Sequence, residues 1–448
     1  MPPTSPAPTA PDTRAVGFGQ ALRFWFWLGC VSFGGPAGQI ALMHEELVVR
    51  RRWISEQRYL HALHYCMLLP GPEAQQLATY IGWLMHRTRG GIAAGALFVL
   101  PSLLLLIGLS WAYTVWGQHP WGQALLWGLK PAVTALVLQA VHRMAKRALQ
   151  RPWLWALAAL SLLGMLWGVG FAWLVLGAGL LGTLVARWQP AAPSAHASAA
   201  PATAGEAAWI DDDTPTPPHA RYRLGRLLRA AGTGLGLWAL SLGALALWLG
   251  PTHTLTRMGG FFTEAALLTF GGAYAVLPYV YQGAIEQYGW LTPRQMIDGL
   301  ALGETTPGPL IMVVAFVAFV GAYGQPPFAG DSAFASGALA AALVTWFTFL
   351  PSFLFILAGG PLVESTHGRL QFTAPLTGIT AAVVGVIVNL ALFFAYHVLW
   401  PEGFGGTFDW LSAAITLGAG VALLGLRRGV IETLLACALL GLAVQLLA

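Results

Sequence analysis

The chain has 448 residues, of which 56% are hydrophobic and only 9% are charged, and its mean hydropathy is +0.64. This balance excludes a soluble globular domain and indicates an integral membrane protein, so the lipid bilayer is the first partner to expect. The net charge of +5 lies in loops without a basic patch, which argues against binding to nucleic acid.

Residues 1–16, rich in proline, threonine and alanine, are predicted to form a disordered tail rather than a signal peptide. Apolar stretches then recur along nearly the whole chain, and many are long enough to cross a hydrocarbon core of roughly 30 Å. The short alternating segments of an outer-membrane barrel are absent. The sequence therefore predicts an all-α polytopic membrane protein.

Residues 17–187 are predicted to form the N-terminal one of two repeats. Its region 18–86 contains the triple arginine Arg50–Arg52, and two re-entrant hairpins would keep these charges in the cytoplasm, as the positive-inside rule requires. The hairpin tips would be Gly34-Gly35-Pro36 and Pro70-Gly71-Pro72, because glycine permits positive φ and proline removes a backbone donor. Continuous spans are expected near 91–116, 122–142, 153–168 and 170–186.

A second change in composition follows the first repeat. Residues 188–226 are predicted to be a cytoplasmic linker rich in proline and alanine, flexible because it cannot bury enough apolar surface to fold. One extra transmembrane helix is expected at 227–250, and residues 251–448 would form the C-terminal repeat. The odd number of crossings between the copies predicts that the second copy is inverted.

Three motifs recur in the two halves at a constant separation of 237 residues. The matching pairs are SFGGP at 32–36 with TFGGA, RWIS at 52–55 with GWLT, and LPGPE at 69–73 with TPGPL. The LPS motif recurs at 100–102 and 350–352, and Gly128 recurs as Gly378 at the same larger separation. These matches predict two inverted-topology repeats with broken or re-entrant helical hairpins.

Broken helices at membrane depth indicate a site. Unsatisfied backbone amides cost several kcal/mol each in hydrocarbon, so a break is tolerated only where it is buried in protein or lines a polar cavity. A helix that starts at a break directs its free N–H groups at that cavity, which suits an anion. One isolated Pro-Gly-Pro would more often mark a simple kink, but four breaks in two-fold register favour a site.

Charged residues near the breaks are candidates for coupling or gating, because buried charges in membranes are usually functional. We select Glu73 and Glu304, which flank the two Pro-Gly-Pro tips, and Lys130, which interrupts an apolar span. Glu264 and Asp298 are interpreted as solvated residues at hairpin mouths.

Other polar and aromatic residues receive structural interpretations. Arg23 and Arg143 are interpreted as boundary residues that snorkel to the membrane surface. Trp53 and Trp290 occupy equivalent positions and are predicted to dock the link between the two hairpins of each copy. No metal site or cofactor is predicted, since the histidines near Cys66 lack a zinc motif and no P-loop is present.

The motifs SFGGPAGQIALMHEELV, RRWIS, LPGPEAQQLATYIGW, FGGAYAVLPYV, GWLT and TTPGPL resemble those of the bacterial chromate ion transporter family in its long-chain form. The resemblance spans roughly 20–187 and 257–447. It implies export of chromate from the cytoplasm, with sulfate as a chemically similar competitor. The motif positions taken as substrate-binding are Ser32, Phe33, Gly34, Gly35, Pro36, Pro70, Gly71, Pro72, Gln75, Gln76, Thr269, Phe270, Gly271, Gly272, Thr305, Thr306, Pro307, Gly308 and Pro309.

Residues and resemblance together predict a secondary transporter, not an enzyme. It would export chromate, or a related oxyanion such as sulfate, across the bacterial inner membrane and confer chromate resistance. An oxyanion channel and a sulfate transporter are the alternatives, because the same helix termini would serve a pore. The sequence leaves the oligomeric state open, with a homodimer as one option.

Overall fold

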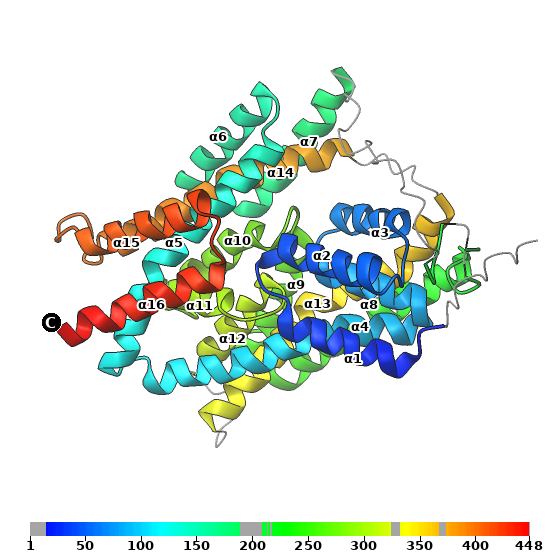
Figure 1. The fold of residues 1–448 in the computed structure, drawn as a ribbon, viewed down its shortest axis with the longest axis horizontal. Coiled ribbons are helices and arrows are strands. Elements are labelled where there is room, and N and C mark those ends of the chain that lie inside the picture. The colour runs from blue at the N-terminus through cyan, green and yellow to red at the C-terminus, as the bar shows by residue number, and fades with distance from the viewer. Residues whose placement is uncertain are drawn as a thin grey trace, which may run out of the picture.

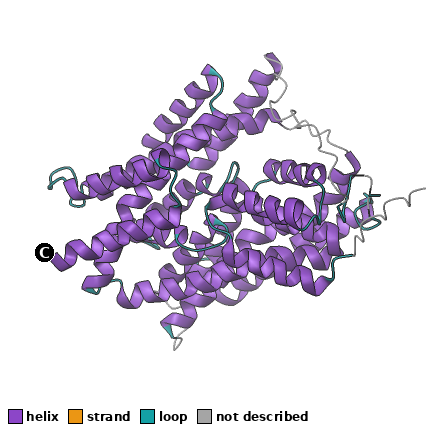
Figure 2. Cartoon of the chain, in the orientation of Figure 1, coloured by secondary structure: helices purple, strands orange, loops and turns teal. Residues whose placement is uncertain are grey.

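The computed structural model describes residues 15–188, 208–212, 214–215, 217–323, 332–366 and 373–447. Nearly every regular element in these ranges is a helix (Figure 2). The one strand-like pairing found there is an isolated bridge between Ile54 and Ile210. Seven of the described helices are long and apolar enough to cross a membrane. The prediction of an all-α polytopic membrane protein is confirmed.

The N-terminal half begins with short helices and continues with longer ones. In chain order they are α1 (Phe18–Val31), α2 (Gly35–His44), the π-helix η1 (Glu45–Arg50), α3 (Glu56–Leu68), α4 (Glu73–Trp116), α5 (Pro120–Ala148), α6 (Pro152–Leu166) and α7 (Phe171–Trp188). Helix α8 (Leu224–Leu249) follows at the position expected for the extra span.

The C-terminal half repeats this succession. Its elements are α9 (Thr254–Leu268), η3 (Ala273–Ala275), α10 (Leu277–Tyr281), the π-helix η4 (Gln282–Gln287), α11 (Pro293–Glu304), η5 (Leu310–Met312), α12 (Val313–Tyr323), α13 (Ala333–Thr366), α14 (Thr373–Leu399), α15 (Trp410–Gly420), η6 (Val421–Gly425) and α16 (Val430–Leu447). The π-helices η1 and η4 start 237 residues apart, which is the separation of the sequence motifs. The internal repeat in sequence is thus also a repeat of local structure.

Helix α4 reverses direction within its length. At His86 and Arg87 the backbone leaves the helical region, and Arg87 has φ of +58°. The segments on either side then pack together, since a β-carbon on Gly95 would lie 2.3 Å from the hydroxyl oxygen of Thr79. The reversal lies where the second hairpin was expected to end, and glycines allow its two arms to touch.

The helices form two groups (Figure 1). Helices α5, α6, α7, α14, α15 and α16 pack on one another, and α1 to α4 pack with α8, α9, α12 and α13. Within the first group Gly128 on α5 meets the backbone of α16, and Gly378 on α14 meets the backbone of α7. Each of these repeated glycines therefore joins a helix of one half to a helix of the other.

Each tryptophan of the repeated RWIS/GWLT motif docks on its own half. Trp53 packs edge-on against Phe24 with ring centroids 5.0 Å apart, and Trp290 packs against Phe261 at 5.6 Å. The amides of both tryptophans donate to the preceding π-helix, from Trp53 to Leu47 O and from Trp290 to Ala284 O. These contacts agree with the predicted docking role.

The described end of the connector differs from the sequence expectation. Ile210 and Ala220 are buried, and the amide of Ile210 donates to Trp53 O at 3.1 Å. His219 contacts the carbonyl oxygen of Trp83 at 2.9 Å, and burial lowers the pKa of its imidazole. Backbone hydrogen bonds hold these residues against the loop that precedes α3, and the His219 side chain holds them against α4. The flexibility of the connector as a whole stays a prediction.

Candidate functional site

The helices are interrupted at the four positions that the glycine and proline motifs mark. The interruptions fall at 32–34, 69–72, 269–272 and 305–309, and we number them breaks 1 to 4. Glycines at these positions have positive φ, with +87° at Gly34, +117° at Gly71, +79° at Gly271 and +102° at Gly308. Side chains with a β-carbon rarely adopt these angles, so the motif glycines set the shape of the breaks.

The breaks are joined in pairs across the two halves. The amide of Gly71 in break 2 donates to Thr269 O in break 3 at 2.8 Å, and the amide of Gly308 in break 4 donates to Ser32 O in break 1 at 2.7 Å. Because Gly71 corresponds to Gly308 and Ser32 to Thr269, the two hydrogen bonds are equivalent under the repeat. Residues far apart in the sequence thus form one layer, which we call the break layer.

The repeated LPS serines complete this layer. A β-carbon on Gly71 would lie 2.6 Å from Ser352 Oγ, and one on Gly308 would lie 2.7 Å from Ser102 Cβ. Each Pro-Gly-Pro glycine is therefore closed in by a serine of the opposite half. This close approach explains why the motif needs glycine and why LPS recurs in both copies.

Several buried polar atoms in the break layer lack a hydrogen-bond partner within the described chain. They are Ser32 Oγ, Ser102 Oγ and the amide oxygens of Gln39, Gln75 and Gln76. All five residues are at most 1% exposed. Since buried polar groups are almost always satisfied, these atoms are candidates to bind water or a polar ligand.

Not all hydroxyls predicted for substrate are available as donors. Thr269 donates to Ala265 O, Thr305 to Leu302 O and Thr306 to Gly303 O, so each proton is used within its own helix. Their oxygens can still accept, but a chromate ion accepts hydrogen bonds and cannot donate to them. Among the predicted hydroxyls, Ser32 is the one whose oxygen has no partner in the described chain.

The predicted tip residues fall into an outer and an inner set. Gly34 and Gly271 are exposed, and Phe33, Pro36, Phe270 and Gly272 are half-buried. Gly71, Pro72, Pro307, Gly308 and Pro309 are buried. The glycines of breaks 1 and 3 therefore lie at the edge of the layer, whereas Ser32, Thr269 and breaks 2 and 4 form its interior.

Gln39 is a member of the site that sequence reasoning missed. Its amide nitrogen donates to Gly308 O at 2.5 Å and lies 3.5 Å from Ser32 O, so it ties break 1 to break 4. The signal was present in the sequence, because Gln39 lies about one turn into the helix that starts at Gly35-Pro36. Its counterpart in the second half is Val276, which hid it from a search for repeated residues.

An arginine near the end of α5 acts electrostatically on the carboxylate at each tip. Glu304 is buried and accepts a hydrogen bond from Tyr274 at 2.5 Å, and Arg143 is close enough to act on it electrostatically. Arg147 acts in the same way on Glu73 and reaches the sulfur of Met67 at 3.6 Å. Arg143 is itself exposed and donates to Gln139 Oε1 at 3.0 Å, so its interpretation as a boundary residue stays a prediction.

Lys130 forms a buried ion pair rather than facing the tips directly. Its Nζ lies 3.4 Å from Asp298 Oδ1, and the phenol of Tyr113 donates to Asp298 Oδ2 at 3.1 Å. Asp298 is 1% exposed, so the prediction that it is solvated at a hairpin mouth is wrong. Glu264 is exposed, as expected, and accepts a hydrogen bond from Tyr279 at 2.8 Å.

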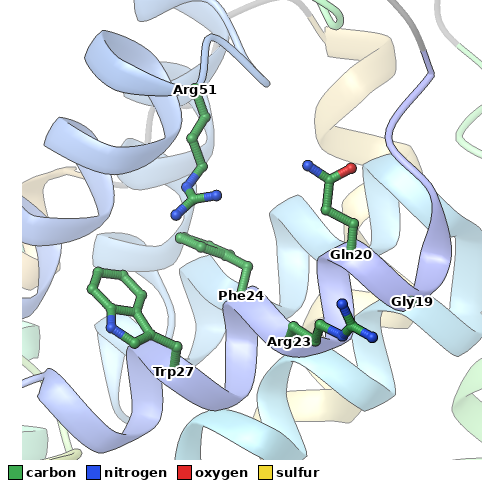
Figure 3. Close-up of a pocket in the computed structure, with 6 residues that line it drawn as sticks. All are labelled: Gly19, Gln20, Arg23, Phe24, Trp27 and Arg51. Carbon is green, nitrogen blue, oxygen red and sulfur yellow. The ribbon is translucent and has the colours of Figure 1, made fainter.

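Arg23 lies apart from the breaks, in a cavity of about 470 Å³ on the surface of α1 (Figure 3). The cavity is lined by Gln20, Phe24, Trp27 and Arg51 as well as Gly19, and Arg51 is stacked over the ring of Phe24 at 4.9 Å (Figure 3). Arg23 precedes break 1 by two turns of helix, so it does not contribute to the break layer.

A multi-pass membrane protein whose interrupted helices meet in a polar layer belongs to the class of discontinuous-helix transport proteins. The chain is a member of the chromate transporter family, whose model matches residues 19–183 and again residues 256–442. The two matches begin 237 residues apart, as the motifs do. One family model thus describes both halves.

Curated relatives cover most of the chain. A chromate transport protein of Pseudomonas aeruginosa is 32% identical over 425 residues, which are 90% of each chain. A chromate transport protein of Cupriavidus metallidurans is 30% identical over 87% of this chain and 88% of its own. A probable chromate transport protein of Synechococcus elongatus is 29% identical over 83% of this chain and 82% of its own. No solved structure matches the chain significantly.

Proposed function

We propose that this protein is a secondary transporter that exports chromate across the bacterial inner membrane and so confers chromate resistance. The observation that carries the proposal is the break layer, in which crossed hydrogen bonds join four helix breaks around polar atoms without partners. Helix termini and amide groups stabilise an oxyanion without requiring a fixed countercharge for each oxygen. The relatives named as chromate transport proteins support chromate as the substrate.

Substrate binding is assigned to the motif residues of the four breaks, with Gln39 and Ser102 added. Ser32 and Gln39 are on one side of the layer, and Gln75 and Gln76 are on the other. The amide nitrogen of Gln76 donates to Pro70 O at 2.7 Å, so a small rotation of this side chain would offer it to a ligand. Sulfate has the same charge and shape as chromate and should compete for these donors.

We assign coupling to Glu73 and Glu304, because each carboxylate lies at a tip and within electrostatic reach of an exposed arginine of α5. When an oxyanion approaches, Arg143 and Arg147 can exchange a carboxylate for the substrate. A carboxylate released in this way can take up a proton, which links proton movement to anion movement. Lys130 is assigned to gating through its pair with Asp298.

Alternating access requires that the two halves be inverted relative to each other, and the contacts support this arrangement. Phe18, at the start of α1, packs against His86 at the reversal of α4, with ring centroids 5.4 Å apart. By contrast Asp298, in the second turn of α11, reaches Tyr113 at the other end of α4. The hairpins of the two halves would therefore enter the layer from opposite faces.

The test is uptake of labelled chromate into energised everted membrane vesicles, compared with vesicles that lack the protein. Accumulation above equilibrium that excess sulfate reduces would support an exporter with an oxyanion site. Equilibration without accumulation would identify a channel. Accumulation of sulfate but not of chromate would identify a sulfate transporter, and the absence of both fluxes with the protein present in the membrane would refute the proposal.

A further inference from the structure

Two buried clusters of the same composition lie on either side of the break layer. Each contains one cation, one carboxylate and one tyrosine. The first cluster is Lys130, Asp298 and Tyr113, described above. The second is Arg58, Glu364 and Tyr80, in which Arg58 pairs with Glu364 at 3.1 Å and Tyr80 donates to the other carboxylate oxygen at 2.5 Å. Both carboxylates are at most 6% exposed.

Helix α4 shows that the clusters lie at opposite sides. Ser102 marks the level of the break layer on the second arm of α4, and Tyr113 is roughly 17 Å beyond it at 1.5 Å per residue. Tyr80 lies on the first arm, next to Thr79, which packs against Gly91 and Gly95 of the second arm. These two glycines precede Ser102 on the second arm by roughly 10–17 Å. On α13, Glu364 is likewise roughly 18 Å from Ser352, which touches break 2.

The two clusters lie at equivalent contacts between helices of the two halves. The second cluster joins α3 to α13, and the first joins α11 to α4, which are the corresponding helices of the other half. The residues themselves are not repeated, since Arg58 corresponds to Gln295 and Asp298 to His61. The two helix contacts thus carry charged residues at different positions of the repeat. A buried ion pair rarely stabilises a protein more than packed apolar residues would.

We propose that each of these two clusters holds one side of the transporter closed. Opening either side then requires breaking the ion pair on that side. This inference rests on the proposed transport function. In the present structure both pairs are formed, which corresponds to a state with the break layer closed on both sides. Removing the charge of one carboxylate leaves the cation without its ion-pair partner, although Arg58 still donates to Thr214 O. The lost ion pair destabilises the closed side and favours the open one.

The test measures access to the break layer rather than transport. Cys30, Cys66 and Cys437 are replaced by serine, and Ser32→Cys supplies one thiol that is fully buried in the layer. Labelling by a membrane-impermeant maleimide is then followed from each face, in right-side-out and everted vesicles. D298N should accelerate labelling from the face nearest Tyr113 by about tenfold, and E364Q from the opposite face by a similar factor.

Two further variants keep the test decisive. K130Q breaks the first pair from its other member and should reproduce the effect of D298N, whereas E264Q removes an exposed carboxylate outside both clusters and should change neither rate. The inference fails if D298N and E364Q leave both rates unchanged, or if they open the same face. Chromate uptake is measured separately in the protein that retains Ser32. Opposite effects on labelling, together with no chromate uptake by that protein, would retain the gates and reject the substrate, so the two proposals can be distinguished.

Discussion

The two halves of this protein share a backbone but differ in the side chains that they bring to the break layer. Both have the same succession of interrupted helices and the same crossed hydrogen bonds, from Gly71 and from Gly308. The amides, however, all come from the first half, as Gln39, Gln75 and Gln76. Their counterparts are Val276, Met312 and Val313, which are buried apolar residues. The two copies thus share the interrupted backbone, whereas the amide side chains of the break layer are found in the first copy alone.

The shared frame predicts equal and large effects at the two central glycines. G71A and G308A each add a β-carbon at positive φ, which costs roughly 1–2 kcal/mol before the contact with the facing serine is counted. Each variant should reduce vesicle chromate uptake by at least about tenfold. G19A on α1, where a β-carbon meets nothing within 4 Å, is the matched control. A large difference between G71A and G308A would show that the two breaks are not functionally equivalent.

The divided chemistry predicts an unequal effect at Glu304 and at its counterpart Met67. E304Q keeps an acceptor for Tyr274 but cannot release a proton. We expect accumulation of chromate to be lost while equilibrium exchange across the membrane persists, because the exchange of anions does not need coupling. M67L should leave both fluxes within about twofold of the parent, since it conserves volume. Retained accumulation in E304Q would remove Glu304 from the coupling mechanism.

A smaller inequality is expected at Gln39 and Val276. Q39A leaves Gly308 O without its side-chain donor, and an unsatisfied buried polar group costs roughly 1–3 kcal/mol. Chromate uptake should therefore fall by about tenfold. V276A removes only apolar contacts and should alter the melting temperature more than the affinity for chromate. Comparable losses of uptake in the two variants would argue that Gln39 serves packing alone.

The smallest predicted effects are again symmetrical. W53F and W290F preserve an aromatic ring against Phe24 and Phe261 and should each lower the free energy of unfolding by about 1 kcal/mol. The melting temperature of the purified protein in detergent gives the measurement. Transport by the molecules that remain folded should not change. A selective loss of transport in one variant would assign that tryptophan to the moving part of the mechanism.

The sequence predicted the position of each break because glycine and proline act locally on the backbone. It could not predict which polar atoms would contact one another. The backbone of Gly308 contacts Ser32 and Gln39 only because the tertiary fold brings distant parts of the chain together. Asp298 was misjudged for the same reason. Its partner Lys130 is distant in sequence, so nothing local distinguished a buried ion pair from a solvated carboxylate. The hydrogen bonds at the described end of the connector were not predicted, because composition carries no information about backbone hydrogen bonds.

The crossed hydrogen bonds also constrain the order of events during synthesis. Gly71 donates to a carbonyl that lies 198 residues later in the chain. At roughly 5–20 residues per second, the ribosome needs about 10–40 s to make that acceptor. Until then the Gly71 amide of the first half lacks its native acceptor. Water or the insertion machinery must satisfy it in or beside the bilayer. The two halves therefore complete their folding together, after the second half has been made. They do not fold one after the other as independent domains.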